Sequence, residues 1–275
     1  FPLQKRGAAV GIYVGSLVIG SGFSLLVSGL LMEYIGWKGV IFSTSCLSII
    51  ASILMMAIKI PLLKSNENSL KIQWNVIKRV LKKKNLLVNT GYAGHTWELY
   101  AMWAWIGPFL VYYYGVQGLE QTEAIRYGNI TGAIVIMIGG IATYVGGKLA
   151  DQFGHIKVVN IFLFISISCS IMIGWLDSVP FIVMFIVLFI YGFSIVADSP
   201  IYNVAITNVS DPEVMGLALG VQSVIGFSVT IFSPMIFGFL LESFSWGIAF
   251  MVIGLVTIIS PICMLVLKKE QASSS

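Results

Sequence analysis

Residues 7–37 read GAAVGIYVGSLVIGSGFSLLVSGLLMEYIGW, and residues 216–246 read GLALGVQSVIGFSVTIFSPMIFGFLLESFSW. The two stretches align without gaps at a constant offset of 209 residues, and each carries G-x-x-x-G near its start and Glu-x-x-x-Trp at its end. The identical pairs include Gly7 and Gly216, Gly11 and Gly220, Gly29 and Gly238, Leu31 and Leu240, Glu33 and Glu242, and Trp37 and Trp246. Matches in one register, at equivalent places, predict a structural repeat.

The composition predicts an integral membrane protein. The 275 residues are 57% hydrophobic and only 10% charged, with a mean hydropathy of +0.93. So few charged residues cannot cover the surface of a soluble domain. The three cysteines lie singly inside apolar runs, without metal-ligand spacing, and indicate core positions. We expect the lipid bilayer as a partner and no nucleic acid.

The apolar runs predict an all-α, polytopic membrane helix bundle. We expect spans at 8–33, 38–58, 86–115, 128–149, 158–176, 180–207, 213–241 and 246–267, each long enough for about 20 residues in the bilayer core. Of the 16 Lys and Arg residues, all except Lys38 and Arg126 fall on the side of the loop 59–85. The excess of basic residues on cytoplasmic loops predicts that both ends of this chain are cytoplasmic. Residues 72–81 form either a short interfacial helix or a solvated linker with a basic edge.

The repeat sets the expected domain organisation. Its two copies open the first and the seventh predicted span, so the repeated unit has six helices. Residues 1–58 then form the last two helices of an N-terminal half, and residues 59–85 form a basic cytoplasmic loop. Residues 86–267 form a complete C-terminal half, and 268–275 form a cytoplasmic tail. This arithmetic predicts that about 140 residues, or four helices, precede Phe1 in the intact protein.

The loop after the fourth predicted span reads GKLADQFGHIK at residues 147–157. Two six-helix halves joined by a basic loop, with this sequence between helices, resemble the major facilitator superfamily. The signature of that family has the form G-x-x-x-D-R/K-x-G-R/K-x-R/K. Gly147, Asp151, Gly154 and Lys157 match it, whereas the chain has Gln and His at its two other basic positions.

The resemblance implies a secondary transporter that works by alternating access and binds a small-molecule substrate. It also implies that Asp151 contacts the N-terminus of a neighbouring helix and helps to hold one gate closed. A carboxylate is stabilised there by free N–H groups and the helix dipole. We expect the helix that begins near Val214 to receive it, and the alternative is that Lys148 and Lys157 act only as topological anchors.

A narrower similarity lies in the sequences GYAGHTWELY at 91–100 and ADS at 197–199. They are similar to a branch of bacterial permeases grouped with cyanate and nitrate-type carriers. This similarity implies the plasma membrane of a bacterium or archaeon, and we expect the intact protein to be a monomer.

Ionisable residues inside the predicted spans are the candidate site, because they are costly in a membrane and usually functional. His95 and Glu98 are three residues apart and share a helix face, which Tyr92 and Trp105 extend. His95 lies about 14 Å along the helix from Leu86, near the membrane midplane. We predict that this pair binds a coupling proton or contacts substrate, and the alternative is a structural hydrogen-bonded pair.

Two further polar positions are candidates. Asp198 stands two residues before Pro200, which breaks the local helix. We expect Asp198 either to line the inner cavity together with Ser199 or to cap the distorted helix. Gln222 is a candidate polar contact of the penultimate helix.

The G-x-x-x-G pairs have a simpler interpretation. Gly7, Gly11, Gly216 and Gly220 allow close helix packing in lipid, and such contacts can also slide in a transporter.

Other function classes have less support. Motifs of hydrolases, zinc enzymes and nucleotide-binding proteins are not found, so we expect no enzyme activity, no cofactor and no metal site. A channel or a non-transporting receptor remains an alternative, although the repeat favours a rocking carrier. Among carriers, uptake of a small anion competes with export of lipophilic compounds by proton antiport. No Arg or Lys lies clearly inside a span, which weakens the anion hypothesis.

Overall fold

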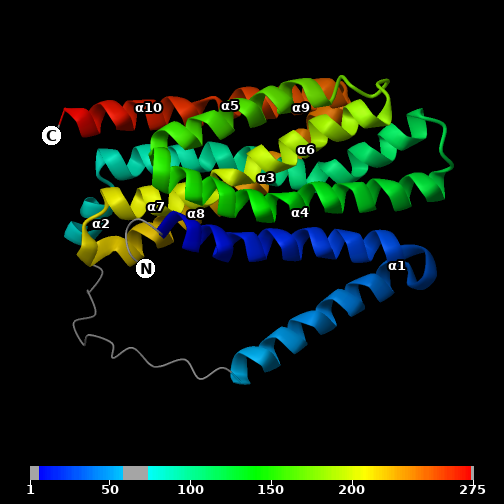
Figure 1. Ribbon diagram of the computed structural model, residues 1–275, viewed down its shortest axis with the longest axis horizontal. Coiled ribbons are helices and arrows are strands. Elements are labelled where there is room, and N and C mark those ends of the chain that lie inside the picture. Colours follow the sequence, from blue (N-terminus) through cyan, green and yellow to red (C-terminus); the bar gives the residue numbers. More distant parts are fainter. Residues whose placement is uncertain (1–5, 58–73, 274–275) are drawn as a thin grey trace.

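The structure is a computed structural model that describes residues 6–57 and 74–273. The described residues form helices and connecting turns, which run roughly along one axis in Figure 1. The helices are α1 Arg6–Ala57, α2 Trp74–Val80, α3 Lys83–Val116, α4 Gln121–Phe153, α5 His155–Ile173, α6 Phe181–Ala197, α7 Ser199–Val209, the short 3₁₀ helix η2 Pro212–Val214, α8 Met215–Ser243, α9 Trp246–Thr257 and α10 Ile259–Ala272.

Six of the described helices are long and apolar enough to cross a membrane. Two of these are interrupted rods, α6 with α7 and α9 with α10. The 52-residue α1 is far longer than a bilayer needs, and Gly36, at φ 64°, divides it into two arms. When the two arms of α1 are counted separately and the 34-residue α3 is added, these helices correspond to the eight predicted spans. The all-α polytopic membrane bundle is therefore confirmed.

Several predicted boundaries differ from the structure. The helix α4 begins at Gln121, well before the predicted 128, and α10 continues through Ala272, so most of the predicted tail is helical. Part of the expected loop 59–85 lies outside the described residues. In the described part of this loop, residues Trp74–Val80 form the helix α2, and Val80 is only 1% exposed. This burial favours a packed interfacial helix over a solvated linker.

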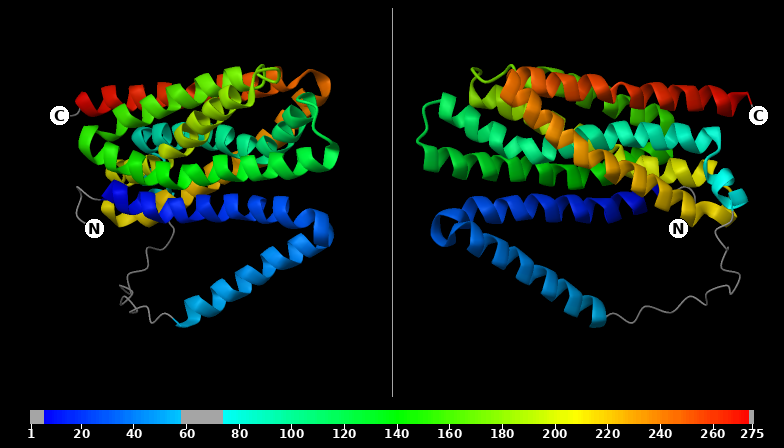
Figure 2. Two further views of the ribbon diagram at one scale, coloured as in Figure 1. Left: turned by 45° about the vertical axis from the view of Figure 1, so that its right-hand side comes forward. Right: turned by 180° about the vertical axis from the view of Figure 1, so that it is seen from behind.

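The two arms of α1 differ in their packing. The first arm lies along α4, whereas the second arm leaves the bundle at an angle in both views of Figure 2. Large apolar side chains of the second arm are exposed, including Phe42 and Met56. A turn at Gly36 allows this departure because its positive φ is readily available to glycine.

The matched glycines of the repeat lie in different surroundings. A Cβ added at Gly7 or Gly11 would lie 2.5 Å from the carbonyl oxygen of Gly147 or Thr143, respectively. A Cβ added at Gly216 or Gly220 would meet no described atom within 4 Å beyond the nearby backbone of its own helix. Close helix packing is therefore seen for the first pair of glycines only, in the part of the chain that the structure describes.

The buried core has two apolar clusters. One includes Phe109, Phe237 and Phe250 and lies toward the end where α9 begins. The other includes Val88 and Met264 and lies toward the end that carries α2 and the C-terminus. Along α3, the two clusters leave a short polar segment between them, and this segment holds the candidate site.

Candidate functional site

A central cavity of about 490 Å³ lies between the first arm of α1 and the helices α3, α6, α7 and α8. Its walls combine aromatic and small polar side chains. The lining residues are Tyr13, Val14, Ser16, Leu17, Val18, Tyr92, His95, Thr96, Leu99, Tyr100, Trp103, Val196, Ser199, Asn203, Ser223 and Phe227. None of these lining residues is Lys, Arg, Asp or Glu.

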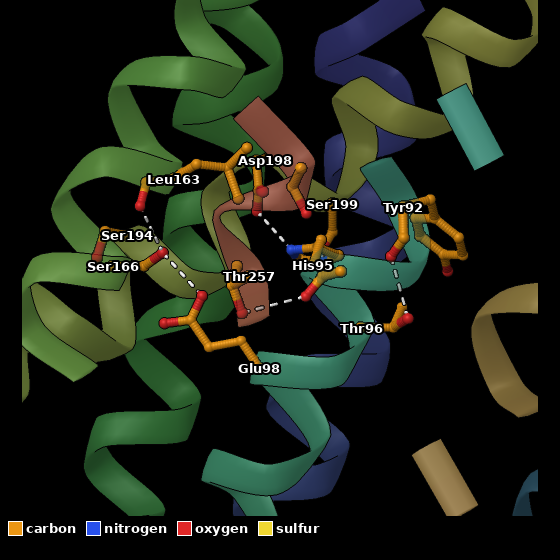
Figure 3. Close-up of polar contacts among 12 residues, drawn as sticks. Tyr92, His95, Thr96, Glu98, Leu163, Ser166, Ser194, Asp198, Ser199 and Thr257 are labelled. Carbon is orange, nitrogen blue, oxygen red and sulfur yellow. Dashed lines mark hydrogen bonds and ion pairs between the residues drawn. The ribbon is translucent and has the colours of Figure 1, made fainter. Parts of the chain in front are cut away.

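At the wall of this cavity, His95 bridges two neighbours. Its Nδ1 atom lies 3.0 Å from Oδ1 of Asp198, and its Nε2 atom lies 2.8 Å from Oγ of Ser199. His95 and Asp198 are only 2% and 1% exposed. Figure 3 shows the imidazole of α3 directed at the α6–α7 junction. The structure thus places a His–Asp pair at the cavity, with histidine on the cavity side.

The break between α6 and α7 positions Asp198. Pro200 stands in the first turn of α7 and cannot continue the helical hydrogen bonds of α6. Asp198 occupies the N-cap position of α7, but its side chain makes no capping hydrogen bond. Of the two predicted roles, capping is therefore not observed, and Asp198 does not itself line the cavity. Its carboxylate instead contacts the imidazole of His95, which does.

Glu98 is buried on a different side of α3. It is 1% exposed, and its Oε2 accepts a hydrogen bond of 3.2 Å from Oγ of Ser166 on α5. Figure 3 shows the carboxylate turned toward α5 and away from the imidazole, and Glu98 does not line the cavity. The predicted pairing of His95 with Glu98 is thus wrong in geometry, because the carboxylate partner of His95 is Asp198.

Aromatic rings hold the imidazole of His95 in place. Tyr202 stacks on it at a centroid distance of 5.6 Å, and the ring of Tyr92 lies 5.9 Å away. Gln222 is buried and donates from Nε2 to the backbone carbonyl of Tyr202 at 3.3 Å. Gln222 therefore supports the aromatic packing and does not line the cavity.

Trp105 also lies away from the cavity. Its Nε1 donates to the carbonyl of Pro234 at 3.0 Å, and its ring stacks on Phe237 at 5.2 Å. The α3 face that reaches the cavity continues from His95 through Leu99 to Trp103. These three positions are four residues apart and so lie on one face of the helix. Extending the face from His95 at this spacing predicts Trp103, and not Trp105, at the cavity.

The cavity wall from α1 had no sequence signal. Tyr13 and Ser16 line the cavity, but they stand in a run of apolar and small residues like the rest of that arm. Tyr100 and Phe227 were also not predicted, although Tyr100 continues the same polar and aromatic face of α3.

The signature loop makes a second polar contact, at the end of the bundle that carries α2. Asp151 accepts hydrogen bonds from the backbone N–H groups of Gly7 and Ala8, each at 3.1 Å. The carboxylate therefore lies at the N-terminus of α1, where free N–H groups stabilise it. The expected recipient near Val214 is wrong. Gly147 allows the approach because its backbone directly contacts that of Gly7.

The other two matched positions shape the loop. Gly154 adopts φ 91° between α4 and α5, a conformation that favours glycine. Nζ of Lys157 lies 6.0 Å from the centre of the Phe153 ring. The predicted loop is thus reduced to a tight turn at Gly154, and Asp151 reaches α1 from the last turn of α4.

Comparison with known families agrees with this geometry. The family model of the Major Facilitator Superfamily matches residues 1–234 of the chain. The chain belongs to the Major Facilitator Superfamily. It is accordingly a multi-pass integral membrane protein of a transporter family, and transport, not catalysis, is the activity typical of the superfamily. No curated protein matches the chain.

Within a Major Facilitator Superfamily protein, the site divides into two parts. The His95–Asp198 pair adjoins a cavity at the middle of the rods, and Asp151 ties α4 to α1 at their ends. The family match does not distinguish branches of the superfamily, so similarity to cyanate and nitrate-type permeases stays a prediction. Among the described residues, no group of three His, Cys, Asp or Glu side chains is placed to hold a metal ion.

Proposed function

We propose that this protein is a secondary active transporter that moves a small solute by alternating access and couples this movement to protons. The observation that carries the proposal is the buried His95–Asp198 pair beside the central cavity. The cavity holds the solute, and the pair holds the coupling proton.

The low-dielectric surroundings explain why such a pair suits coupling. An imidazolium beside a carboxylate is a neutral pair, whereas loss of its proton leaves one buried negative charge. An isolated buried charge is costly, so the proton content of His95 and Asp198 depends on how much water reaches them. Opening of the cavity to one side or the other changes that access. Proton binding and the orientation of the cavity are thereby linked.

The cavity walls favour an uncharged or lipophilic solute over a small anion. The lining residues include no Lys or Arg that would bind an anion. Tyr13, Tyr92, Tyr100, Trp103 and Phe227 instead present aromatic surface. Small polar groups such as those of Ser16 and Asn203 offer a few hydrogen bonds, as is common in sites for organic molecules. This lining supports a second candidate within the same class, export of lipophilic compounds by proton antiport.

The orientation in the membrane follows from the charges. Arg79, Lys82 and Lys83 lie at the same end of the bundle as the C-terminal turn of α10, because Lys83 binds Glu270 at 2.7 Å. We assign this basic end to the cytoplasm on the positive-inside rule.

The test uses proteoliposomes that contain the protein and a pH-sensitive dye. A panel of uncharged, cationic and anionic solutes is added, and we expect saturable solute movement accompanied by a pH change that a proton ionophore abolishes. Alkalinisation or acidification on solute addition separates antiport from symport. Non-saturable flux without a pH change would indicate a channel, and binding without flux would indicate a receptor.

A matched pair of variants assigns the coupling group. Asp198→Asn keeps the size of the side chain but removes its negative charge, so we expect solute exchange to continue without proton movement. Asp177→Asn is the control, because Asp177 does not line the cavity and instead accepts a hydrogen bond of 3.0 Å from the hydroxyl of Tyr112. Proton movement unchanged in Asp198→Asn would rule out this residue as the coupling group.

A further inference from the structure

A second cavity lies at the basic end of the bundle and shares no lining residue with the central cavity. Its volume is about 430 Å³, and it lies between the α4–α5 junction, α7 and the C-terminal part of α10. Its polar side chains are those of His155, Lys157, Asn208, Lys268 and Gln271. No carboxylate lines it.

The two lysines give this cavity its charge. Neither Lys157 nor Lys268 makes a salt bridge with any residue that the structure describes. The nearest carboxylates in the sequence have other partners, because Asp151 binds the N-terminus of α1 and Glu270 binds Lys83. The cavity is therefore cationic and lacks an internal counter-ion among the described residues.

Hydrogen-bond donors converge on the same cavity. The 19-residue α5 begins at His155 without a side-chain cap, so its first-turn N–H groups lack helical acceptors. Nε2 of His155 is enclosed and has no hydrogen-bond partner among the described residues. The side-chain amides of Asn208 and Gln271 line the same space. Lysines, amide donors and a helix N-terminus together match the oxygen atoms of a phosphate group.

The surfaces next to the cavity are suited to acyl chains. On α5, Ile161 and Phe164 are 49% and 74% exposed, and on α10, Ile262 and Leu265 are 53% and 51% exposed. In a bilayer these side chains face lipid. A phosphate group in the cavity would therefore stand at the head of two lipid-facing helices, as basic pockets between membrane helices bind acidic headgroups. We propose that this cavity binds the phosphate group of an anionic phospholipid of the cytoplasmic leaflet.

The test measures lipid retention by native mass spectrometry of the detergent-solubilised protein. Phosphatidylglycerol and phosphatidylcholine with the same acyl chains are added separately. We expect the protein to retain phosphatidylglycerol preferentially, and Lys157→Gln or Lys268→Gln to reduce this retention about fivefold each. Lys269→Gln is the matched control, since this exposed neighbour carries the same charge but does not line the cavity. Thermal unfolding checks that each variant is folded.

Three results would overturn the proposal. Equal losses in Lys268→Gln and Lys269→Gln would show nonspecific attraction to the basic end. Retention unchanged in folded Lys157→Gln and Lys268→Gln variants would exclude the cavity as the site. Displacement of phosphatidylglycerol by excess inorganic phosphate would assign the cavity to a free anion. Because the readout is lipid binding, each result is independent of solute transport and proton coupling.

Discussion

The imidazole of His95 on α3 lies 3.0 Å from the carboxylate of Asp198 at the α6–α7 junction, and neither side chain is more than 2% exposed. This contact joins two helices in the middle of the bundle. The other imidazole nitrogen, Nε2, is hydrogen-bonded to Ser199, which lines the cavity. The pair therefore has both a structural consequence and the proposed coupling role, and the two can be measured separately.

His95→Ala tests the structural consequence. Removal of the imidazole leaves the carboxylate of Asp198 buried without its partner, so we expect a loss of about 3 kcal/mol in the free energy of unfolding. In the double variant His95→Ala/Asp198→Leu the loss should be smaller, because no unpaired carboxylate remains. Denaturant unfolding in detergent measures both. Additive losses would show that the two side chains do not interact.

Glu98→Gln tests a separate contribution. Glu98 contacts Ser166 and lies outside the cavity lining, so we expect solute affinity to stay within about twofold of the wild type. Proton-driven uptake should fall, because a buried carboxylate that can take up a proton is lost. Uptake and solute binding are compared in one preparation. Unchanged pH-driven uptake would remove Glu98 from the coupling pathway.

The α1–α4 contact predicts the effect of Gly11→Ala. The added Cβ would lie 2.5 Å from the carbonyl oxygen of Thr143, so the helix backbones must separate at a cost of about 1–3 kcal/mol. Gly220→Ala is the matched control at the equivalent repeat position, where an added Cβ would meet no described atom within 4 Å beyond the nearby backbone of its own helix. Its effect should stay within about 0.5 kcal/mol or be stabilising. Thermal unfolding of both variants is the measurement, and equal effects would contradict the packing difference.

Asp151→Ala tests the contact at the start of α1. Loss of a carboxylate that accepts from helix N-terminal N–H groups costs about 1 kcal/mol. We expect hydrogen exchange at the amides of Gly7 and Ala8 to accelerate about fivefold, with little change at the far end of the bundle. Hydrogen-exchange mass spectrometry gives both values. Unaltered exchange at these amides would show that Asp151 does not hold them.

Asp211 predicts a dependence on pH and salt outside the membrane. The Lys82 ammonium and the Arg79 guanidinium, each 3.0 Å from the same carboxylate oxygen, lower the pKa of Asp211. A lowered pKa stabilises the fold above the unfolded value of about 3.9, and this stabilisation disappears as the pH falls through the folded value. We therefore expect Asp211→Asn to lower the unfolding temperature at pH 7.

The same difference between wild type and Asp211→Asn should shrink in acid and in high salt, because protonation or screening removes the ion pairs. Thermal unfolding across pH and salt concentration measures it. A difference that stays constant under all these conditions would show that Asp211 does not act through charge.

Prediction from sequence succeeded for the helices and only in part for the site. The apolar runs located the membrane-spanning helices because each helix must be apolar enough to enter lipid. This hydropathy is a local property of the sequence. The break at Gly36 also fell between two predicted spans. In contrast, spacing on a single helix suggested Glu98 as the partner of His95. Spacing could not show that the carboxylate of Asp198, which is far from His95 in the sequence, contacts the imidazole in the folded protein.

The sequence by itself therefore determined the class of the protein, the course of its described helices and the basic end of the bundle. These depend on hydropathy and charge summed along each segment. Only the tertiary structure decided which carboxylate meets His95, which helix receives Asp151 and why Gly11 is packed whereas Gly220 is open. Such contacts depend on how each helix is rotated and which helix it crosses. Two segments with matching sequences can therefore have different neighbours.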